Sequence, residues 1–124
     1  MPKTRILFVE DSIILTLVNC EILREQGFDV VEVNNASAAF EVIDAHEPLS
    51  ALMTDVDLGP GADGFEIARG ARAAYPHLPV VFMSGTAAAR HSSEGVGGSE
   101  FIAKPFHPQQ MLAALDRAIH LEAA

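Results

Sequence analysis

The chain has 124 residues, of which 49% are hydrophobic and 20% are charged, a balance typical of one soluble globular domain. Its net charge of −9 argues against direct binding to nucleic acid, because Lys and Arg contacts to phosphates supply most of that affinity. No apolar stretch approaches the roughly 20 residues that span a bilayer, and the single cysteine excludes an internal disulfide. The first residues run into a strand-like segment rather than a signal peptide, so we expect a cytoplasmic protein without membrane contact.

Apolar runs alternate with helical patterns along the chain. The first half predicts strands over residues 5–11, 29–33 and 52–56 and helices over residues 12–26 and 36–46. Gly27 is a typical stop for the first helix, and Asn35 suits the N-cap of the second.

The second half continues this alternation. A loop rich in glycine, residues 59–64, leads to a helix over residues 65–75 that Pro76 ends, and then to a strand over residues 79–84. Residues 85–94 have the length of a short helix, but the glycines at 95, 97 and 98 weaken that prediction. A strand over residues 100–104 and a helix from Pro108 to about residue 122 complete the pattern.

The order of these elements predicts an α/β fold. Five apolar strands, rich in Val, Ile, Leu and Phe and each followed by a helical segment, favour a parallel sheet that is covered by helices on both faces. Right-handed crossovers then fix the winding. No linker, repeat or low-complexity segment divides the chain, so we expect one domain over residues 1–124.

Four of the predicted strands end on side chains that can act on a phosphoryl group. Glu10 and Asp11 close the first strand, and Asp55 closes the third. Ser84 closes the fourth strand and Lys104 the fifth. Because strands of a parallel sheet end at one edge, where open α/β folds place their sites, we expect these side chains to lie together.

Three clustered carboxylates repel one another, and a hard cation such as Mg²⁺ relieves that repulsion. A single Asp in a loop is usually just solvated, but Glu10, Asp11 and Asp55 at two strand ends favour a shared ion. A carboxylate can also accept a phosphoryl group as an aspartyl phosphate. Mg²⁺ would then neutralise two phosphoryl oxygens, Lys104 would pair with another, and the Ser84 hydroxyl would donate to a third.

The ordered set of motifs resembles the receiver domain of bacterial two-component response regulators over essentially the whole chain. The matching segments are Glu10-Asp11, Asp55, Ser84-Gly85-Thr86 and Lys104-Pro105-Phe106. Each motif alone is weak, whereas all of them in this order are specific. The resemblance implies a flavodoxin-like, doubly wound five-stranded sheet with the strand order 2-1-3-4-5.

The resemblance also implies a role for each residue of the acidic site. Asp55 would accept a phosphoryl group from a histidine kinase or a histidine phosphotransfer protein. Asp11 would bind Mg²⁺ directly and Glu10 through water, and the backbone carbonyl of Asp57 would be a further ligand.

Further expectations concern the response to phosphorylation. By the resemblance, Ser84 and Lys104 would sense the phosphoryl oxygens, and Phe101 occupies the aromatic switch position. It also implies a cis peptide bond between Lys104 and Pro105. Output would then be a protein–protein interaction with a downstream target or a second copy of the chain, without DNA contact.

The first predicted helix carries more apolar residues than one core face needs. Ile13, Ile14 and Leu17 follow the acid pair directly, so we expect some of them to be exposed and to dock the phosphodonor. Ordinary packing within the domain is the alternative.

The resemblance has two departures and leaves rival functions open. The loop over residues 57–64 is longer than the usual turn, and the segment over residues 84–104 is short and rich in glycine. Asp55-Val56-Asp57 also resembles the nucleophile motif of haloacid-dehalogenase-type phosphatases, which that family carries on its first strand. A phosphate sink and a receiver-like module that is not phosphorylated are further alternatives. The histidines show no metal-ligand spacing and are interpreted as surface or capping residues: His46, His77, His91, His107 and His120.

Overall fold

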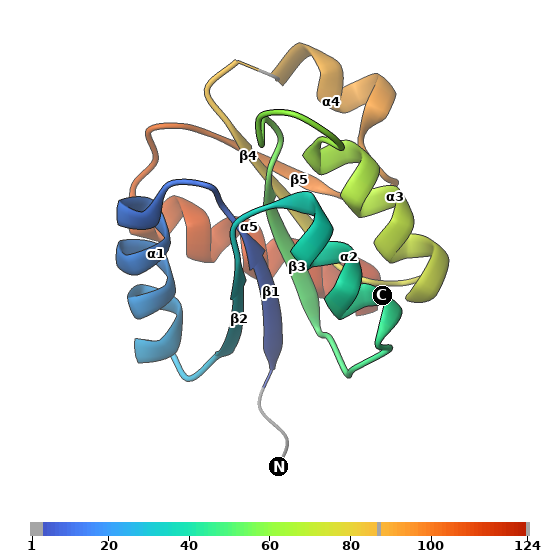
Figure 1. The fold of residues 1–124 in the computed structure, drawn as a ribbon. Coiled ribbons are helices and arrows are strands. Elements are labelled where there is room, and N and C mark those ends of the chain that lie inside the picture. The colour runs from blue at the N-terminus through green and yellow to red at the C-terminus, as the bar shows by residue number, and fades with distance from the viewer. Residues whose placement is uncertain (1–3, 87, 124) are drawn as a thin grey trace.

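One parallel sheet of five strands separates two layers of helices in the structure, a computed structural model that describes residues 4–86 and 88–123 (Figure 1). The strands are β1 (Arg5–Val9), β2 (Asp29–Val33), β3 (Ala51–Asp55), β4 (Val80–Ser84) and β5 (Glu100–Ala103). The helices are α1 (Ile13–Glu25), α2 (Ala36–Asp44), α3 (Gly64–Ala74), α4 (Ala88–Glu94) and α5 (Pro108–Ala123). The strands pair in the order β2-β1-β3-β4-β5, and every pair is parallel, which confirms the predicted fold.

Successive side chains of each strand point to opposite faces of the sheet, and helices cover both faces. Leu7 of β1 lies in one core with Phe65 of α3, whereas Phe8 lies in the other with Leu115 of α5. Burial on both faces explains why the strands are continuous apolar runs rather than alternating patterns. None of the described helices has the length and apolar character needed to cross a membrane.

Two strands end earlier than the sequence predicts, so that candidate site residues lie just beyond the ends of the strands. β1 ends at Val9, so Glu10 and Asp11 lie beyond the sheet. β5 ends at Ala103, so Lys104 lies beyond it as well. The remaining predicted bounds agree with the structure within two residues, apart from the start of α4.

α4 forms although three glycines follow it. Gly95 ends the helix and makes room for a neighbour, because a Cβ there would lie 2.5 Å from Cδ2 of His91. The His91 ring lies between Phe82 of β4 and Phe101 of β5, with centroids 5.6 Å from each. The interpretation of His91 as a surface or capping residue is therefore wrong, since it is half-buried and joins α4 to the sheet. The other histidines are exposed, as predicted: His46, His77, His107 and His120.

Candidate functional site

The carboxyl ends of four strands bring the predicted site residues to one edge of the sheet. Val9, the last residue of β1, pairs with Thr54 of β3, which puts Glu10 beside Asp55. On the other side of β3, Ser84 of β4 pairs with Ala103 of β5, directly before Lys104. The expected meeting of strand ends is thus present in the structure.

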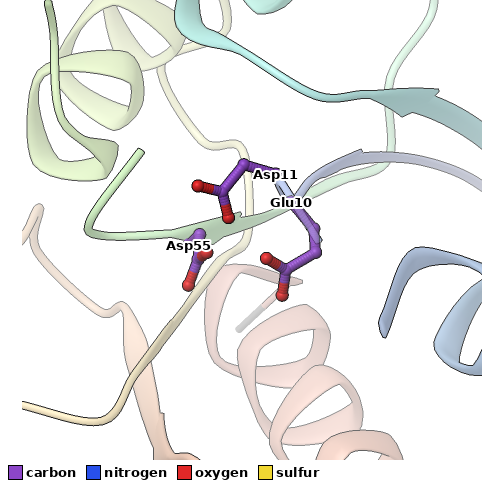
Figure 2. Close-up of side chains that lie close together, drawn as sticks. All are labelled: Glu10, Asp11 and Asp55. Atoms are coloured by element: carbon purple, nitrogen blue, oxygen red, sulfur yellow. The ribbon is translucent and has the colours of Figure 1, made fainter. Parts of the chain in front are cut away.

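Three carboxylates converge at this edge, as Figure 2 shows. One side-chain oxygen each of Glu10, Asp11 and Asp55 lies within 4.8 Å of the others. Glu10 is only 1% exposed and Asp55 only 5%, whereas Asp11 is exposed to solvent. The cluster is therefore open on the Asp11 side and buried around the other two acids.

Lys104 supplies positive charge to the buried pair. Its Nζ lies 2.6 Å from Oε1 of Glu10 and 2.7 Å from Oδ1 of Asp55. The Lys104–Pro105 peptide bond is cis, which confirms the prediction from the family pattern. Lys104 thus pairs with both buried carboxylates.

The pKa values show that this one ammonium does not balance the acids. Burial, followed by the hydrogen bond with Glu10, raises the pKa of Asp55 to about 7. Burial alone would also raise the pKa of Glu10, but hydrogen bonds with Asp55, Lys104 and the Ser12 N–H lower it overall. A pKa of about 7 leaves Asp55 partly protonated at neutral pH, and a further cation in the cluster would favour its ionised form.

The donor set fits a hard divalent cation. Mg²⁺ takes oxygen ligands, usually one or two carboxylates together with waters and phosphate oxygens. Glu10, Asp11 and Asp55 provide such oxygens, and burial followed by the interaction with Glu10 raises the pKa of Asp55, so a bound cation would favour its ionised form. The backbone carbonyl of Asp57 lies on the loop just after Asp55 in the chain, and its role as a ligand stays a prediction.

α3 fixes the loop that follows Asp55. The Gly64 N–H donates to the carbonyl of Val56 at 2.8 Å, and a Cβ at Gly64 would overlap the carbonyl oxygen of Asp55. The Asp63 carboxylate caps α3 by accepting from the Glu66 N–H at 3.0 Å, and the two side chains form a capping box. Only a residue without a side chain fits at Gly64. The close contact of Gly64 with the end of β3 therefore fixes the C-terminal end of the long loop noted in the sequence.

Ser84 makes a contact that sequence reasoning missed. Its hydroxyl donates to Oδ2 of Asp57 at 3.3 Å and accepts from the Thr86 N–H at 3.1 Å. Thr86 also donates from Oγ1 to the same Asp57 oxygen, at 3.4 Å. From the sequence, only the backbone carbonyl of Asp57 was given a role. Its side-chain contact was missed because no local pattern predicts how two loops approach each other.

Phe101 lies apart from the acidic cluster, on β5. It is half-buried, packs against the core shared with α3, and faces the His91 ring. Its position near Ser84 of the neighbouring strand suits the expected switch role, which stays a prediction.

The apolar residues at the start of α1 are exposed, as predicted. Ile13 is 73% exposed, Ile14 72% and Leu17 63%. A groove of about 330 Å³ is lined by the acid pair Glu10 and Asp11, by residues of α1 that include Ile13 and Leu17, and by residues of the end of β2 and the start of α2. The exposure is confirmed, whereas docking of a phosphodonor stays a prediction.

Comparisons with known proteins agree with this geometry. The sequence model of the response regulator receiver domain family matches residues 6–116. The response regulator FleR of Pseudomonas aeruginosa is 33% identical over 91% of this chain, which spans only 24% of FleR. The receiver protein CpdR of Brucella abortus is 30% identical, over 93% of this chain and 96% of CpdR.

A solved structure shows the same fold over its whole length. The receiver protein from Sinorhizobium medicae superposes with a TM-score of 0.93 and 31% identity, covering 97% of each chain. The receiver domain of the hybrid histidine kinase CckA superposes with a TM-score of 0.76 at 27% identity, over 93% of this chain and 98% of that one. By its sequence, its strand order and its converging acids, the chain belongs to the response regulator receiver domain family.

Proposed function

We propose that this domain accepts a phosphoryl group on Asp55, in a Mg²⁺-dependent reaction, and that the modification switches a protein–protein interaction surface. The donor would be the phosphohistidine of a histidine kinase or of a histidine phosphotransfer protein. The observation that carries this proposal is the convergence of Asp55 with Glu10, Asp11 and Lys104 at one sheet edge. The domain would comprise residues 1–124 and act in the cytoplasm.

The chemistry needs an ionised carboxylate and neutralised phosphoryl oxygens. In the transfer, an oxygen of Asp55 forms a bond to phosphorus as the bond from phosphorus to the donor histidine nitrogen breaks. Mg²⁺, when bound, supplies positive charge to the acids and to the phosphoryl oxygens. Glu10, Asp11 and the carbonyl of Asp57 would hold the ion, so that Asp55 reacts without its proton.

Lys104 and Ser84 would recognise the phosphoryl group once it is attached. Lys104 already contacts Asp55 at 2.7 Å and would pair with a phosphoryl oxygen. Ser84 is 2% exposed at the end of the neighbouring strand, and its hydroxyl would donate to another oxygen. Both are charge-neutralising and positioning contacts, which suits a signalling domain rather than an enzyme that acts on other molecules.

The phosphodonor would dock on the first turns of α1. Ile13, Ile14 and Leu17 are exposed there, and Ile13 and Leu17 line the same groove as Glu10 and Asp11. A partner helix on this surface could present its histidine to the acidic site, because α1 begins only two residues after the last acid of the pair.

Output would use the surface of α4, β5 and α5. When Ser84 moves toward the phosphoryl group, Phe101 could turn further inward, and this surface would change shape. Such a change is a shift between two states that differ in their contacts with the phosphoryl group. A downstream protein or a second copy of the chain would bind the shifted state, without direct DNA contact.

Labelling with a small phosphodonor tests the proposal. Acetyl phosphate with Mg²⁺ should add one phosphoryl mass to the protein, and chelation of Mg²⁺ should prevent this. Asp55→Asn should remain unlabelled, whereas Asp44→Asn, an exposed acid at the end of α2, should be labelled like the original chain.

Each alternative function gives a different result. Steady release of phosphate without a stable adduct would indicate a phosphatase of the haloacid-dehalogenase type. No labelling in any variant would indicate a binding module that is not phosphorylated. Labelling of Asp55 without any change at the output surface would indicate a phosphate sink.

A further inference from the structure

The side chain of Asp57 contacts the hydroxyl groups at the end of β4. Its Oδ2 accepts from Ser84 Oγ at 3.3 Å and from Thr86 Oγ1 at 3.4 Å. The Ser84 oxygen in turn accepts from the Thr86 N–H at 3.1 Å. The β3–α3 loop and the end of β4 are thus joined through one carboxylate oxygen, next to the site but outside the cluster of three acids.

A hydroxyl group has one proton to donate. In this structure Ser84 Oγ lies 3.3 Å from Oδ2 of Asp57, to which it donates, and 3.1 Å from the backbone N of Thr86, from which it accepts. Ser84 is almost fully buried, so the direction of its hydroxyl depends on protein partners more than on solvent. For the same proton to reach a phosphoryl oxygen on Asp55, the bond to Asp57 has to break.

We propose that the Asp57 carboxylate is a resting-state latch: it holds the Ser84 hydroxyl away from the phosphoryl position and so opposes activation. The inference rests on the proposed phosphorylation of Asp55 and adds a positioning residue to that reaction. A phosphoryl group shifts the domain only by the contacts that it gains over the resting state. The bond from Ser84 to Asp57 reduces that gain, so the affinity for a phosphoryl group is lower than the site alone would give.

The latch differs from simple charge repulsion between Asp57 and an anionic ligand. Repulsion acts whether or not Ser84 is present, whereas the latch acts only through the Ser84 hydroxyl. Asp57→Ala removes both the acceptor and the charge, and it opens no cavity because the Asp57 side chain is exposed. Asp57→Asn keeps an acceptor oxygen and removes only the charge.

The test is a double-mutant cycle on the affinity for beryllofluoride, a phosphoryl mimic, at saturating Mg²⁺. The dissociation constant is measured by amide NMR for the original chain, Asp57→Ala, Asp57→Asn, Ser84→Ala and the double variant Ser84→Ala/Asp57→Ala. Asp57→Ala should tighten binding about three- to tenfold, as expected for loss of one competing hydrogen bond. In the Ser84→Ala background the same change should tighten binding less than about twofold.

The remaining outcomes are equally decisive. Asp57→Asn should tighten binding less than Asp57→Ala, because its amide oxygen still accepts from Ser84. Equal tightening with and without Ser84, or equal effects of Asn and Ala, would leave charge repulsion as the cause and overturn the latch. Weaker binding by Asp57→Ala would also overturn it. If Ser84→Ala binds too weakly to titrate, initial rates of acetyl phosphate labelling provide a second double-mutant cycle, in which Asp57→Ala should again act only when Ser84 is present.

Failure of the proposed function would look different. In that case the original chain would bind beryllofluoride no better than Asp55→Asn does. Binding that depends on Asp55 but shows additive effects of Asp57 and Ser84 would reject the latch alone.

Discussion

Asp55 is the residue on which the account depends, and its chemistry is set by burial and by two neighbours. Burial, at 5% exposure, and the neighbouring Glu10 raise the pKa of its carboxyl group, and Lys104 offsets only part of that rise. A carboxylate that must react as a nucleophile is thus kept partly protonated until a further cation arrives. We therefore expect the ionisation of Asp55 to depend on both pH and Mg²⁺.

Without Mg²⁺, the stability of the protein should fall as the pH rises. The pKa of Asp55 is raised from 3.8 to about 7, so between these values the folded chain keeps a proton that the unfolded chain releases. The free energy of unfolding should therefore decrease from about pH 5 to about pH 8, by at most about 1.4 kcal/mol per pH unit. The lowered pKa of Glu10 and the raised pKa of Lys104 act outside this range.

Urea unfolding across this range measures the effect. Asp55→Asn should remove the slope, and saturating Mg²⁺ should reduce it because the ion favours the ionised acid. A free energy of unfolding that rises over this range, or the same slope in Asp55→Asn, would contradict the pKa assignment.

The sequence alone placed Glu10, Asp11, Asp55, Ser84 and Lys104, because each follows a buried apolar run whose end is easy to locate. It did not reveal the side-chain contact between Asp57 and Ser84. That contact depends on the path of the β3–α3 loop, which Gly64 and the cap of α3 fix through tertiary packing. Local patterns carry no signal for such an approach, so loop contacts around the site needed the structure.

At the scale of elements, α4 shows the same limit of sequence reasoning. The glycines after it weakened the prediction of a helix. One of them, Gly95, directly follows α4 at a position where a side chain would clash with His91. The His91 ring fills the space between α4 and the sheet, and its Nε2 lies 2.8 Å from Oγ of Ser99. Hydrophobic periodicity could not identify this packing of His91, because a single polar ring between two phenylalanines leaves no repeating pattern in the sequence.

Gly95→Ala should therefore destabilise the protein, whereas Gly97→Ala should not. A methyl group at residue 95 would lie 2.5 Å from Cδ2 and 2.6 Å from the carbonyl oxygen of His91, so α4 has to shift. We expect a loss of about 1–3 kcal/mol, the usual cost of overpacking. At Gly97 a Cβ meets nothing within 4 Å, and the change should stay within about 0.5 kcal/mol.

Chemical denaturation of both variants gives the comparison, and amide exchange over residues 88–94 locates the damage. Equal stability of the two variants would show that the packing of His91 against Gly95 does not hold α4.

Among the residues whose burial the structure describes, the exposed large hydrophobic side chains lie on α1. Ile14→Asp should slow phosphoryl transfer from a histidine donor protein at least about tenfold, as loss of one anchor side chain costs more than about 1.4 kcal/mol. Labelling by acetyl phosphate should be spared, because Ile14 is 72% exposed and does not support the core. Stopped-time labelling with both donors measures the ratio, and equal losses would show damage to the fold instead.

Over the whole molecule, the proposed switch would link the sheet edge with the acids to the surface of α4, β5 and α5 through Ser84 and Phe101. The fold class followed from the sequence pattern, because five apolar runs and their helices repeat without interruption, and the strand order followed from the resemblance to receiver domains. The packing of the half-buried Phe101 against His91, on the proposed output surface, could not be predicted from the sequence.

Beryllofluoride with Mg²⁺ should change amide exchange well beyond the acids. We expect altered protection across residues 85–106, because Ser84 directly precedes this segment, Phe101 lies within it, and local stability varies along the chain. Exchange followed by mass spectrometry, with Asp55→Asn as the control, measures this. Changes confined to the surroundings of Asp55 would reject the switch and favour a phosphate sink.

The most direct test of phosphorylation at Asp55 is to locate the phosphoryl group on the chain. After labelling with acetyl phosphate and Mg²⁺, borohydride reduction converts an aspartyl phosphate to homoserine, which tandem mass spectrometry identifies at a single position. The account predicts homoserine at residue 55 and at no other acid, including the neighbouring Asp11 and Asp57. Homoserine at another residue, or an intact chain that never gains the phosphoryl mass, would contradict it.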